Sequence, residues 1–300
     1  MSENPRPDKH LVKGAVALVT GASRGAGKGI ARELARKGYC VYITGRTKTE
    51  GQQHDGQTSL PGTVHSTAEL IKSEGGHCIP VICDHASDSD VKALVSKIRD
   101  EQGGLDVLVN NAAYIHDDLV KPGPFWTKSI ALATILDVGL RSTYSMTHHA
   151  APLMIKQQHA LVINTSSPGA RCYMHGPAYG GQKAGTDKMT WDMAHDFRPH
   201  DVACISIWMG ILKTERSEAA AAAAPELYAD IMAQAESPEF TGRIIDALYR
   251  SSSLMERSGK TYVGAELALE LDVTDLDGKQ PTSHAPMLGD PIDFSSAVVE

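Results

Sequence analysis

A glycine-rich turn between an apolar run and an amphipathic helix constrains the fold of this chain more than any other feature. Residues 15–20 are small or β-branched and mostly apolar, and glycines are concentrated in residues 21–27. A helical pattern over residues 28–37 and a second apolar run over residues 40–44 follow. This order predicts two parallel strands joined by a helix, because parallel strands need a crossover connection. The sequence therefore predicts an α/β protein with a buried parallel sheet.

The same alternation continues along the chain. Further strands are predicted at residues 78–83, 105–109, 160–164, 202–208 and 260–263. Further helices are predicted at residues 67–73, 88–100, 130–156, 179–197 and 240–249. About seven strands interleaved with helices are typical of a doubly wound Rossmann-type parallel sheet.

Three segments do not follow this alternation. Residues 47–64 are polar and rich in glycine and proline, which indicates an insertion after the second strand. Residues 217–235 contain six consecutive alanines, a composition that favours a helix. Residues 273–300 are rich in Asp, Pro and Ser. We expect one domain over residues 1–272 and an irregular tail over residues 273–300.

Charge and cysteine content exclude several classes of protein. The chain has 300 residues, with 29 basic and 36 acidic side chains and a net charge of −7, so neither nucleic acid nor an anionic membrane surface is an expected partner. Its first residues lack the apolar segment of a signal peptide, and no apolar run approaches the roughly 20 residues of a membrane span. The five cysteines form no Cys-x-x-Cys pair, so free thiols in the cytoplasm are expected.

The glycine loop predicts a phosphate site. Gly21, Gly25 and Gly27 allow a tight turn and a close approach to a pyrophosphate, with Ser23 and Arg24 in the same loop. The N-terminus of the following helix supplies free N–H groups and the positive end of the helix dipole. A simple tight turn is the alternative interpretation.

The end of the second strand indicates which dinucleotide would bind. NAD sites place an acidic residue about here to accept a hydrogen bond from the ribose 2′-hydroxyl, whereas this chain has Gly45 followed by Arg46. A guanidinium suits a 2′-phosphate, and Arg24 is a second candidate clamp. The sequence therefore favours NADP(H) over NAD(H), unless Arg46 is only a solvated side chain at a strand end.

A tyrosine and a lysine carry the predicted chemistry. Tyr179 and Lys183 are four residues apart on a predicted helix, so both project from one face. A phenol with a pKa near 10 is a poor acid–base catalyst at pH 7, and a nearby cation lowers that pKa. The preceding strand ends at Ser166 and Ser167, either of which could hold a carbonyl oxygen. No histidine spacing predicts a metal ligand set.

These motifs, in this order, resemble those of the short-chain dehydrogenase/reductase family over about residues 12–265. Residues 20–27 match its Thr-Gly-x-x-x-Gly-x-Gly signature. The resemblance implies that Ser167 polarises a carbonyl, that Tyr179 donates the proton, and that Lys183 lowers the tyrosine pKa and holds the nicotinamide ribose. Ser167 is preferred to Ser166 because it directly precedes the Pro168-Gly169 turn.

The resemblance extends to the rest of the cofactor site. It implies that Asp84 contacts adenine, although an aspartate capping a helix or turn is the alternative. It implies that Asn111 lines the cofactor, and that Leu212 and Thr214 hold the nicotinamide carboxamide and the pyrophosphate. Residues 213–236 lie where the family has a mobile substrate lid, and a homodimer or homotetramer is implied as well.

One departure concerns the proton relay. The family has an asparagine in the helix before the serine strand, which holds a water that passes protons to the lysine, and Gly139 stands at that position here. Runs around Gly139, Ser167 and Arg46 resemble the subgroup around dehydrogenase/reductase member 1.

The resulting prediction is an NADPH-dependent carbonyl reductase or alcohol dehydrogenase that acts on a small ketone, aldehyde or alcohol. Two alternatives stay open, an NADP(H)-binding sensor or scaffold with weakened catalysis and a reductase of C=C or C=N bonds with the same fold. Positive charge is expected to concentrate at Arg24, Arg46 and Lys183, in an otherwise acidic chain.

Overall fold

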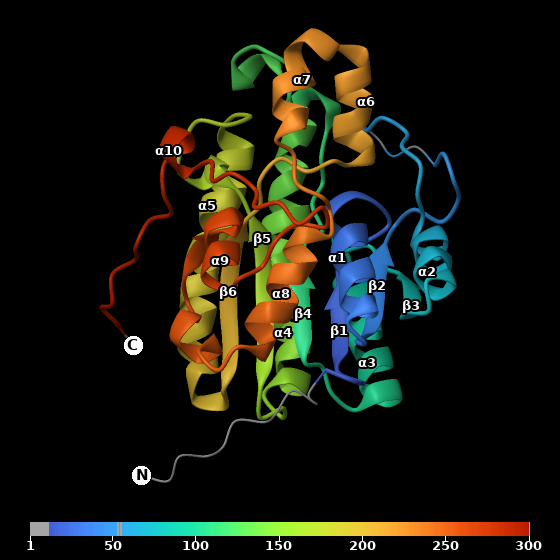
Figure 1. Ribbon diagram of the computed structural model, residues 1–300, viewed down its shortest axis with the longest axis vertical. Helices are drawn as coiled ribbons and strands as arrows, with labels where there is room; N and C mark the ends of the chain where they lie inside the picture. Colours follow the sequence, from blue (N-terminus) through green and yellow to red (C-terminus); the bar gives the residue numbers. More distant parts are fainter. Residues whose placement is uncertain (1–11, 53, 55, 300) are drawn as a thin grey trace.

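Seven strands form one parallel sheet with the strand order β3-β2-β1-β4-β5-β6-β7 (Figure 1). The computed structural model describes residues 12–52, 54 and 56–299. Every strand pairing in the sheet is parallel. The strands are β1 (Val16–Val19), β2 (Cys40–Gly45), β3 (His77–Ile82), β4 (Val107–Asn110), β5 (Ala160–Ser166), β6 (Val202–Trp208) and β7 (Thr261–Val263). The predicted doubly wound sheet is confirmed.

Helices cover both faces of the sheet, which explains why its strands are apolar throughout. In β1, Ala17 and Val19 belong to one buried cluster, while Val16 and Leu18 belong to the cluster on the opposite face. The first face is covered by α1 (Gly25–Arg36), α2 (Val64–Ser73), α8 (Phe240–Arg250) and α9 (Gly264–Glu270). The second face is covered by α3 (Asp88–Gln102), α4 (Ser142–Met154) and α5 (Pro177–Phe197).

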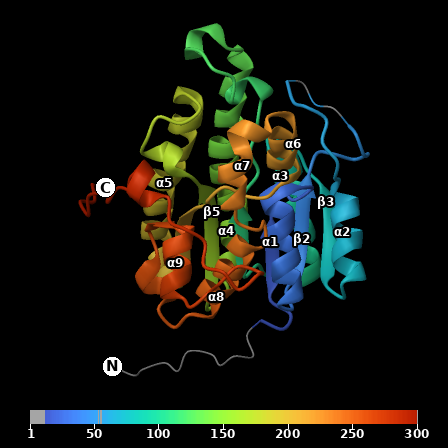
Figure 2. The same ribbon diagram turned by 45° about the horizontal axis from the view of Figure 1, so that its top comes forward.

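The strand order reverses between β1 and β4, and ligands of open α/β sheets bind at such a switch point beside the carboxyl ends of the strands. Two helices of the predicted lid, α6 (Glu215–Ala223) and α7 (Pro225–Ala233), lie at this end of the sheet (Figures 1 and 2). The base of this segment is closed by a bridge between Leu212 and Glu236. Lys213 N also donates to the Glu236 carbonyl at 2.9 Å.

The single long helix predicted over residues 130–156 is wrong. The chain makes a 3₁₀ turn at Ile130–Ala133, breaks at Val138 and Gly139, and becomes α-helical only at Ser142. Gly139 has φ +149, a conformation that a side chain would strain, so the missing Cβ permits the break. The side chains of Ser142 and Thr143 hydrogen-bond Gly139 N and O, both at 2.9 Å, and so replace helical backbone partners.

The tail beyond residue 272 is irregular apart from the short helix α10 (Ala285–Leu288). Asp275 accepts a hydrogen bond from Ser237 N at 2.8 Å, which ties the tail to the end of the lid segment. Arg243 of α8 donates to the Thr274 carbonyl at 2.6 Å. Among the helices of the described residues, none is long and apolar enough to cross a membrane.

Helix α1 packs so closely on the segment before α8 that only glycine fits at position 29. A Cβ at Gly29 would lie 2.2 Å from the Pro238 carbonyl carbon, whereas one at the exposed helical Gly181 would meet nothing within 4 Å. We expect Gly29→Ala to lower the free energy of unfolding by about 1–3 kcal/mol. Gly181→Ala, the matched control, should raise it by up to about 1 kcal/mol. Denaturant titrations of both variants would test this, and equal stabilities would contradict it.

Candidate active site

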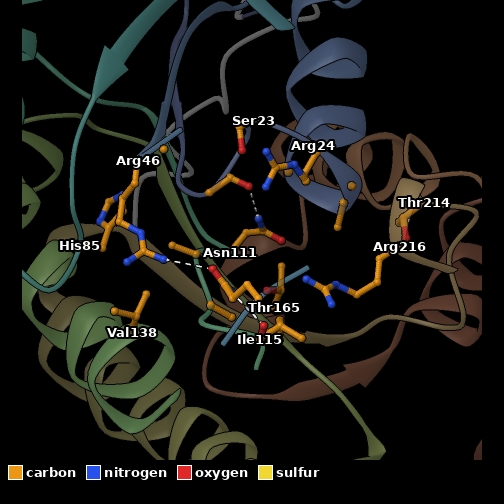
Figure 3. Close-up of a pocket in the computed structure, with 18 of the residues that line it drawn as sticks. Ser23, Arg24, Arg46, His85, Asn111, Ile115, Val138, Thr165, Thr214 and Arg216 are labelled. Atoms are coloured by element: carbon orange, nitrogen blue, oxygen red, sulfur yellow. Dashed lines mark hydrogen bonds between the residues drawn. The ribbon is translucent and has the colours of Figure 1, made fainter. Parts of the chain in front are cut away.

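A cleft of about 350 Å³ opens at the carboxyl ends of β1, β4 and β5 (Figure 3). The sequence-predicted residues that line it are Gly21, Ser23, Arg24, Gly25, Gly27, Arg46, Asn111, Tyr179, Lys183 and Thr214. Residues from distant parts of the chain therefore meet at one place. Leu212, Asp84 and Ser167, which the resemblance also implied, do not belong to the cleft lining, although Ser167 contacts the lining residue Tyr179.

The glycine loop is shaped by backbone contacts. Gly21 and Gly25 have φ +66 and +59, which favour glycine. A Cβ at Gly27 would lie 2.4 Å from the Gly21 carbonyl oxygen, so a side chain would push the loop away from α1. Asn111 holds the other side of the loop, because its Nδ2 donates to the carbonyls of Thr20 at 2.9 Å and Gly21 at 3.1 Å. The loop therefore presents a fixed backbone at the N-terminus of α1.

The carboxylate of Glu215 accepts a hydrogen bond at the N-terminus of α1. Glu215, the first residue of α6, accepts from Gly25 N at 2.9 Å and from Lys28 Nζ at 3.1 Å. Burial raises the pKa of Glu215, but hydrogen bonds from backbone N–H groups and Lys28 outweigh this, and the net pKa lies below its usual value. An anion is therefore already stabilised where the helix dipole favours phosphate. Reading the sequence did not identify this contact.

Three arginines line the cleft. Arg46 and His85 lie on one side, and Thr214 and Arg216 on the other (Figure 3). Arg46 Nη2 lies 3.5 Å from Gln57 Oε1, the long end of the hydrogen-bond range. Arg24, by contrast, donates to the carbonyls of Pro61 and Gly62 at 2.9 and 2.6 Å, so much of its donor capacity holds the 47–64 insertion.

His85 takes the place in the cleft lining that was expected for Asp84. Its Nε2 lies 2.7 Å from Thr44 Oγ1, and burial lowers its pKa to about 4, so the ring is neutral at pH 7. Asp84 instead accepts from Ala86 N at 3.0 Å, a turn contact that matches the alternative interpretation of this residue. The only sequence signal for His85 was its place directly after Asp84 at the end of β3.

The insertion and the lid are joined across the rim of the cleft. Asp117 accepts from Thr58 at 2.7 Å and pairs with Arg216 of α6 at 3.3 Å. Gln57 Nε2 donates to the Ile115 carbonyl at 2.8 Å. Asp117 therefore connects the 47–64 insertion to the first turn of α6.

The proposed catalytic hydroxyls are adjacent. Ser167 Oγ lies 2.9 Å from Tyr179 OH, and Ser167 is held by a hydrogen bond from Gly169 N at 3.2 Å. Ser166 points away from them, toward the Lys183 carbonyl at 3.4 Å. The geometry thus favours Ser167 over Ser166 as the partner of Tyr179.

Burial has the largest effect on the pKa values of Tyr179 and Lys183, which both lie on α5. It raises the pKa of Tyr179, against the opposing hydrogen bond with Ser167. This net direction is opposite to the one expected from Lys183 alone, because the loss of hydration prevails. Burial lowers the pKa of Lys183 to about 8, and the Asp187 carboxylate opposes that change. The Lys183 ammonium lies 5.6 Å from the centre of the Tyr179 ring and donates to the Thr165 carbonyl at 3.3 Å.

Asp187 is a buried acid that the sequence reasoning missed. It is 5% exposed, lies one helical turn after Lys183, and accepts from Ser206 at 2.7 Å and Trp208 Nε1 at 2.8 Å. Two strong donors hold the carboxylate in place beside the lysine. The i, i+4 spacing from Lys183 was the available signal.

Thr214 caps α6, because its hydroxyl accepts from Ser217 N at 3.2 Å, and it also lines the cleft. The cap fixes the residue where the loop from β6 becomes the lid. Leu212 lies two residues earlier, in the bridge to Glu236, and its backbone supports the base of the lid.

A parallel sheet with a glycine loop, a helix N-terminus and a Ser–Tyr–Lys arrangement at its switch point defines a dinucleotide-dependent oxidoreductase. The family model for short chain dehydrogenases matches residues 15–224. The chain is 37% identical over 279 residues to dehydrogenase/reductase SDR family member 1 of Homo sapiens, covering 89% of this chain and 85% of that protein. It therefore belongs to the short-chain dehydrogenase/reductase family and resembles that subgroup.

Other relatives are more distant. Hydroxysteroid dehydrogenase-like protein 2 of Bos taurus is 32% identical over 205 residues, which are 67% of this chain and 46% of that protein. A short chain dehydrogenase of Mycobacterium thermoresistibile has a TM-score of 0.72 at 24% identity, covering 91% of this chain and 92% of the other. A mutant short-chain dehydrogenase/reductase of Serratia marcescens has a TM-score of 0.69 at 23% identity, covering 85% and 97%. Both structures share the fold.

The family uses NAD(P)(H), and the residues present fit such a cofactor. The backbone cradle at Gly21 and Gly27 leaves no room for side chains, and the arginines of the cleft suit phosphates. Arg46 and Thr214 would hold the phosphate-bearing parts, and Lys183 would hold a ribose.

Because Glu215 lies at the N-terminus of α1, it would repel a pyrophosphate bound there. We expect Glu215→Gln to lower the Kd for NADPH and for NADH by about two- to fivefold. Isothermal titration of the wild type and the variant would measure this. Glu218→Gln, on the exposed side of α6, removes the same charge and should leave both constants unchanged. Weaker binding by Glu215→Gln would mean that the carboxylate supports the loop.

Proposed function

We propose that the protein is an NADPH-dependent carbonyl reductase that interconverts a ketone or aldehyde and the corresponding alcohol. The observation that carries this proposal is the 2.9 Å contact between Ser167 Oγ and Tyr179 OH beside the buried Lys183. These three groups provide an acid, a carbonyl-binding hydroxyl and a cation close together, with Tyr179 and Lys183 in the lining of the cleft and Ser167 in contact with Tyr179.

The side chains divide the chemistry between them. Ser167 Oγ donates a hydrogen bond to the substrate carbonyl oxygen, and Tyr179 OH gives its proton to that oxygen as negative charge develops on it. When bound, the nicotinamide supplies the hydride for the carbonyl carbon. Burial raises the pKa of Tyr179, so the phenol is protonated at pH 7 and has the proton that it would donate.

The cofactor preference rests on charge. Arg46 follows the second strand, where an NAD site would carry an acidic residue, and its guanidinium makes a long contact of 3.5 Å with Gln57. Arg24 and Arg216 line the same cleft in a chain of net charge −7. This concentration of positive charge supports binding of the additional 2′-phosphate of NADP(H).

An apolar groove of about 330 Å³ supports an uncharged, hydrophobic substrate. Most of its lining is apolar, including Phe125, Trp126, Ile130 and Leu132, and Lys128 and His175 also line it. The centre of the His175 ring lies 5.1 Å from the centre of the Tyr179 ring, and the two rings pack edge-on. The groove therefore reaches a side chain that contacts the proposed acid. A ketone or aldehyde on an apolar body would fit this arrangement.

Two alternative functions stay open. Gly139 removes the family's asparagine, which favours a cofactor-binding sensor or scaffold with weakened catalysis. A reductase of C=C or C=N bonds could use the same hydroxyls.

The five cysteines are all unpaired, which supports a reducing compartment such as the cytoplasm. A homodimer or homotetramer is proposed from the family alone.

Tyr179→Phe removes the proposed acid and keeps the ring. We expect it to lower the rate of NADPH oxidation with a panel of ketones and aldehydes by about 10²- to 10⁴-fold, with the Kd for NADPH unchanged. Tyr173→Phe, at an 82% exposed position, is the matched control and should be as active as the wild type. Equal rates in Tyr179→Phe and the wild type would refute the mechanism. Tight NADPH binding without turnover of any carbonyl by the wild type would support the sensor.

Arg46→Asp tests the 2′-phosphate assignment. A lost charge-assisted hydrogen bond contributes about 1.5–3 kcal/mol, so we expect the Kd for NADPH to rise at least tenfold while that for NADH falls. Arg99→Asp makes the same charge change at an exposed position of α3 and should alter neither constant. If the NADPH affinity of Arg46→Asp equals that of the wild type, Arg46 does not bind the phosphate.

A further inference from the structure

The described residues of the 47–64 insertion contact both the glycine loop and the loop after β4, and they line the cleft. At the glycine loop, a Cβ at Gly62 would lie 2.5 Å from the Ser23 carbonyl oxygen, so the two backbones are in close contact. At the loop after β4, Asp117 N donates to the Gly56 carbonyl at 2.8 Å. The insertion contributes four side chains to the cleft lining, those of Thr47, His54, Gln57 and Leu60. A molecule bound in the cleft would therefore meet this insertion.

The Gln57 side chain joins Arg46 to the loop after β4. Its Nε2 donates to the Ile115 carbonyl at 2.8 Å, and its Oε1 faces Arg46 Nη2 at 3.5 Å (Figure 3). A carbonyl only accepts hydrogen bonds and a guanidinium only donates them. Both contacts therefore require the same orientation of the amide, with its nitrogen toward Ile115 and its oxygen toward Arg46. All three residues line the cleft.

This arrangement orients the Arg46 guanidinium and takes little of its capacity to bind an anion. A guanidinium has five N–H donors, and the contact with Gln57 uses one of them, at the long end of the hydrogen-bond range. An arginine side chain that is already oriented loses less conformational entropy when it binds a ligand. Gln57 therefore prepares Arg46 for a ligand in the cleft.

The partner of Arg46 in this contact is neutral, and its neutrality matters for the charge of the cleft. Arg216, which lines the same cleft, pairs instead with the Asp117 carboxylate at 3.3 Å, and that carboxylate offsets its charge. The Gln57 amide carries no charge, so it orients Arg46 without offsetting the positive charge that an anion would meet.

We infer that Gln57 is a specificity-determining residue of the cofactor site, because it ties Arg46 to the Ile115 carbonyl and so orients the guanidinium for the 2′-phosphate of NADP(H). The inference rests on the proposed preference for NADP(H). Gln57 acts through Arg46 and is a positioning residue. NADH lacks the 2′-phosphate, so the loss of Gln57 should weaken the binding of NADPH and leave that of NADH almost unchanged.

Two nucleotides without a nicotinamide isolate this end of the cofactor. Adenosine 2′,5′-bisphosphate carries the 2′-phosphate, and adenosine 5′-monophosphate lacks it. We expect Gln57→Leu to raise the Kd for the bisphosphate by about three- to tenfold, because Arg46 loses its fixed orientation. Gln57→Glu places a carboxylate beside the guanidinium and should raise this Kd by about tenfold or more. The Kd for the monophosphate should stay near the wild-type value in both variants, as measured by isothermal titration.

Gln52 supplies the matched controls. It lies in the same insertion and its Oε1 accepts from Lys48 N at 2.8 Å, but it is not part of the cleft lining. Gln52→Leu and Gln52→Glu should leave both constants at their wild-type values. Equal weakening of the two nucleotides by Gln57→Leu, or the same selective loss in the Gln52 variants, would mean that the insertion only shapes the cleft and would overturn the inference.

A double substitution tests whether Gln57 acts through Arg46. In an Arg46→Leu background, Gln57→Leu should raise the Kd for the bisphosphate no further, since the effects of two residues that share one contact do not add. A further loss as large as the one in the wild-type background would overturn the inference.

The wild-type protein separates this inference from the proposed cofactor preference. If it binds the bisphosphate no more tightly than the monophosphate, the preference for NADP(H) fails and the inference fails with it. If it prefers the bisphosphate and Gln57→Leu keeps that preference unchanged, the preference stands and only the role of Gln57 is overturned.

Discussion

The buried ammonium of Lys183 is the constraint around which the proposed catalytic half of the cleft is arranged. A cation that is 7% exposed loses most of its hydration, which lowers its pKa to about 8. Asp187 opposes this loss, and Ser206 and Trp208 fix the carboxylate from β6. A buried charge with one partner removed is strongly destabilising, so the packing of α5 on β6 and the protonation of Lys183 depend on each other. Strand β6, on which α5 packs, therefore also influences the electrostatics of the site through Ser206 and Trp208.

Backbone contacts, rather than a buried charge, organise the half of the cleft that is proposed to hold the cofactor. Asn111, at the end of β4, holds the glycine loop through the carbonyls of Thr20 and Gly21. The close approach at Gly27 then aligns the loop with α1. Backbone geometry therefore creates the phosphate cradle, and charged side chains are added at its rim. The two halves meet at the switch point between β1 and β4, so a bound dinucleotide would join them.

The predicted site residues that the structure brings together are those whose sequence signal is local. The turn at Gly21 and the spacing of Tyr179 and Lys183 are properties of short segments, and the structure brings them together. The break at Gly139 was missed although glycine is a poor helix former, because the side-chain hydrogen bonds of Ser142 and Thr143 that replace the helical backbone partners are not visible in the apolar pattern. Contacts between residues that are far apart in the sequence leave no such local signal.

Glu215 is an example of such a contact, since it reaches Gly25 from 190 residues away. Together with the Asp117–Arg216 pair, it connects the first turn of α6 to both rims of the cleft. The Asp117–Arg216 pair is partly exposed, and such pairs contribute little stability, about 0–1 kcal/mol each. The Asp117–Arg216 pair therefore adds little to the anchoring of the predicted lid, whose base is fixed by the backbone bridge between Leu212 and Glu236.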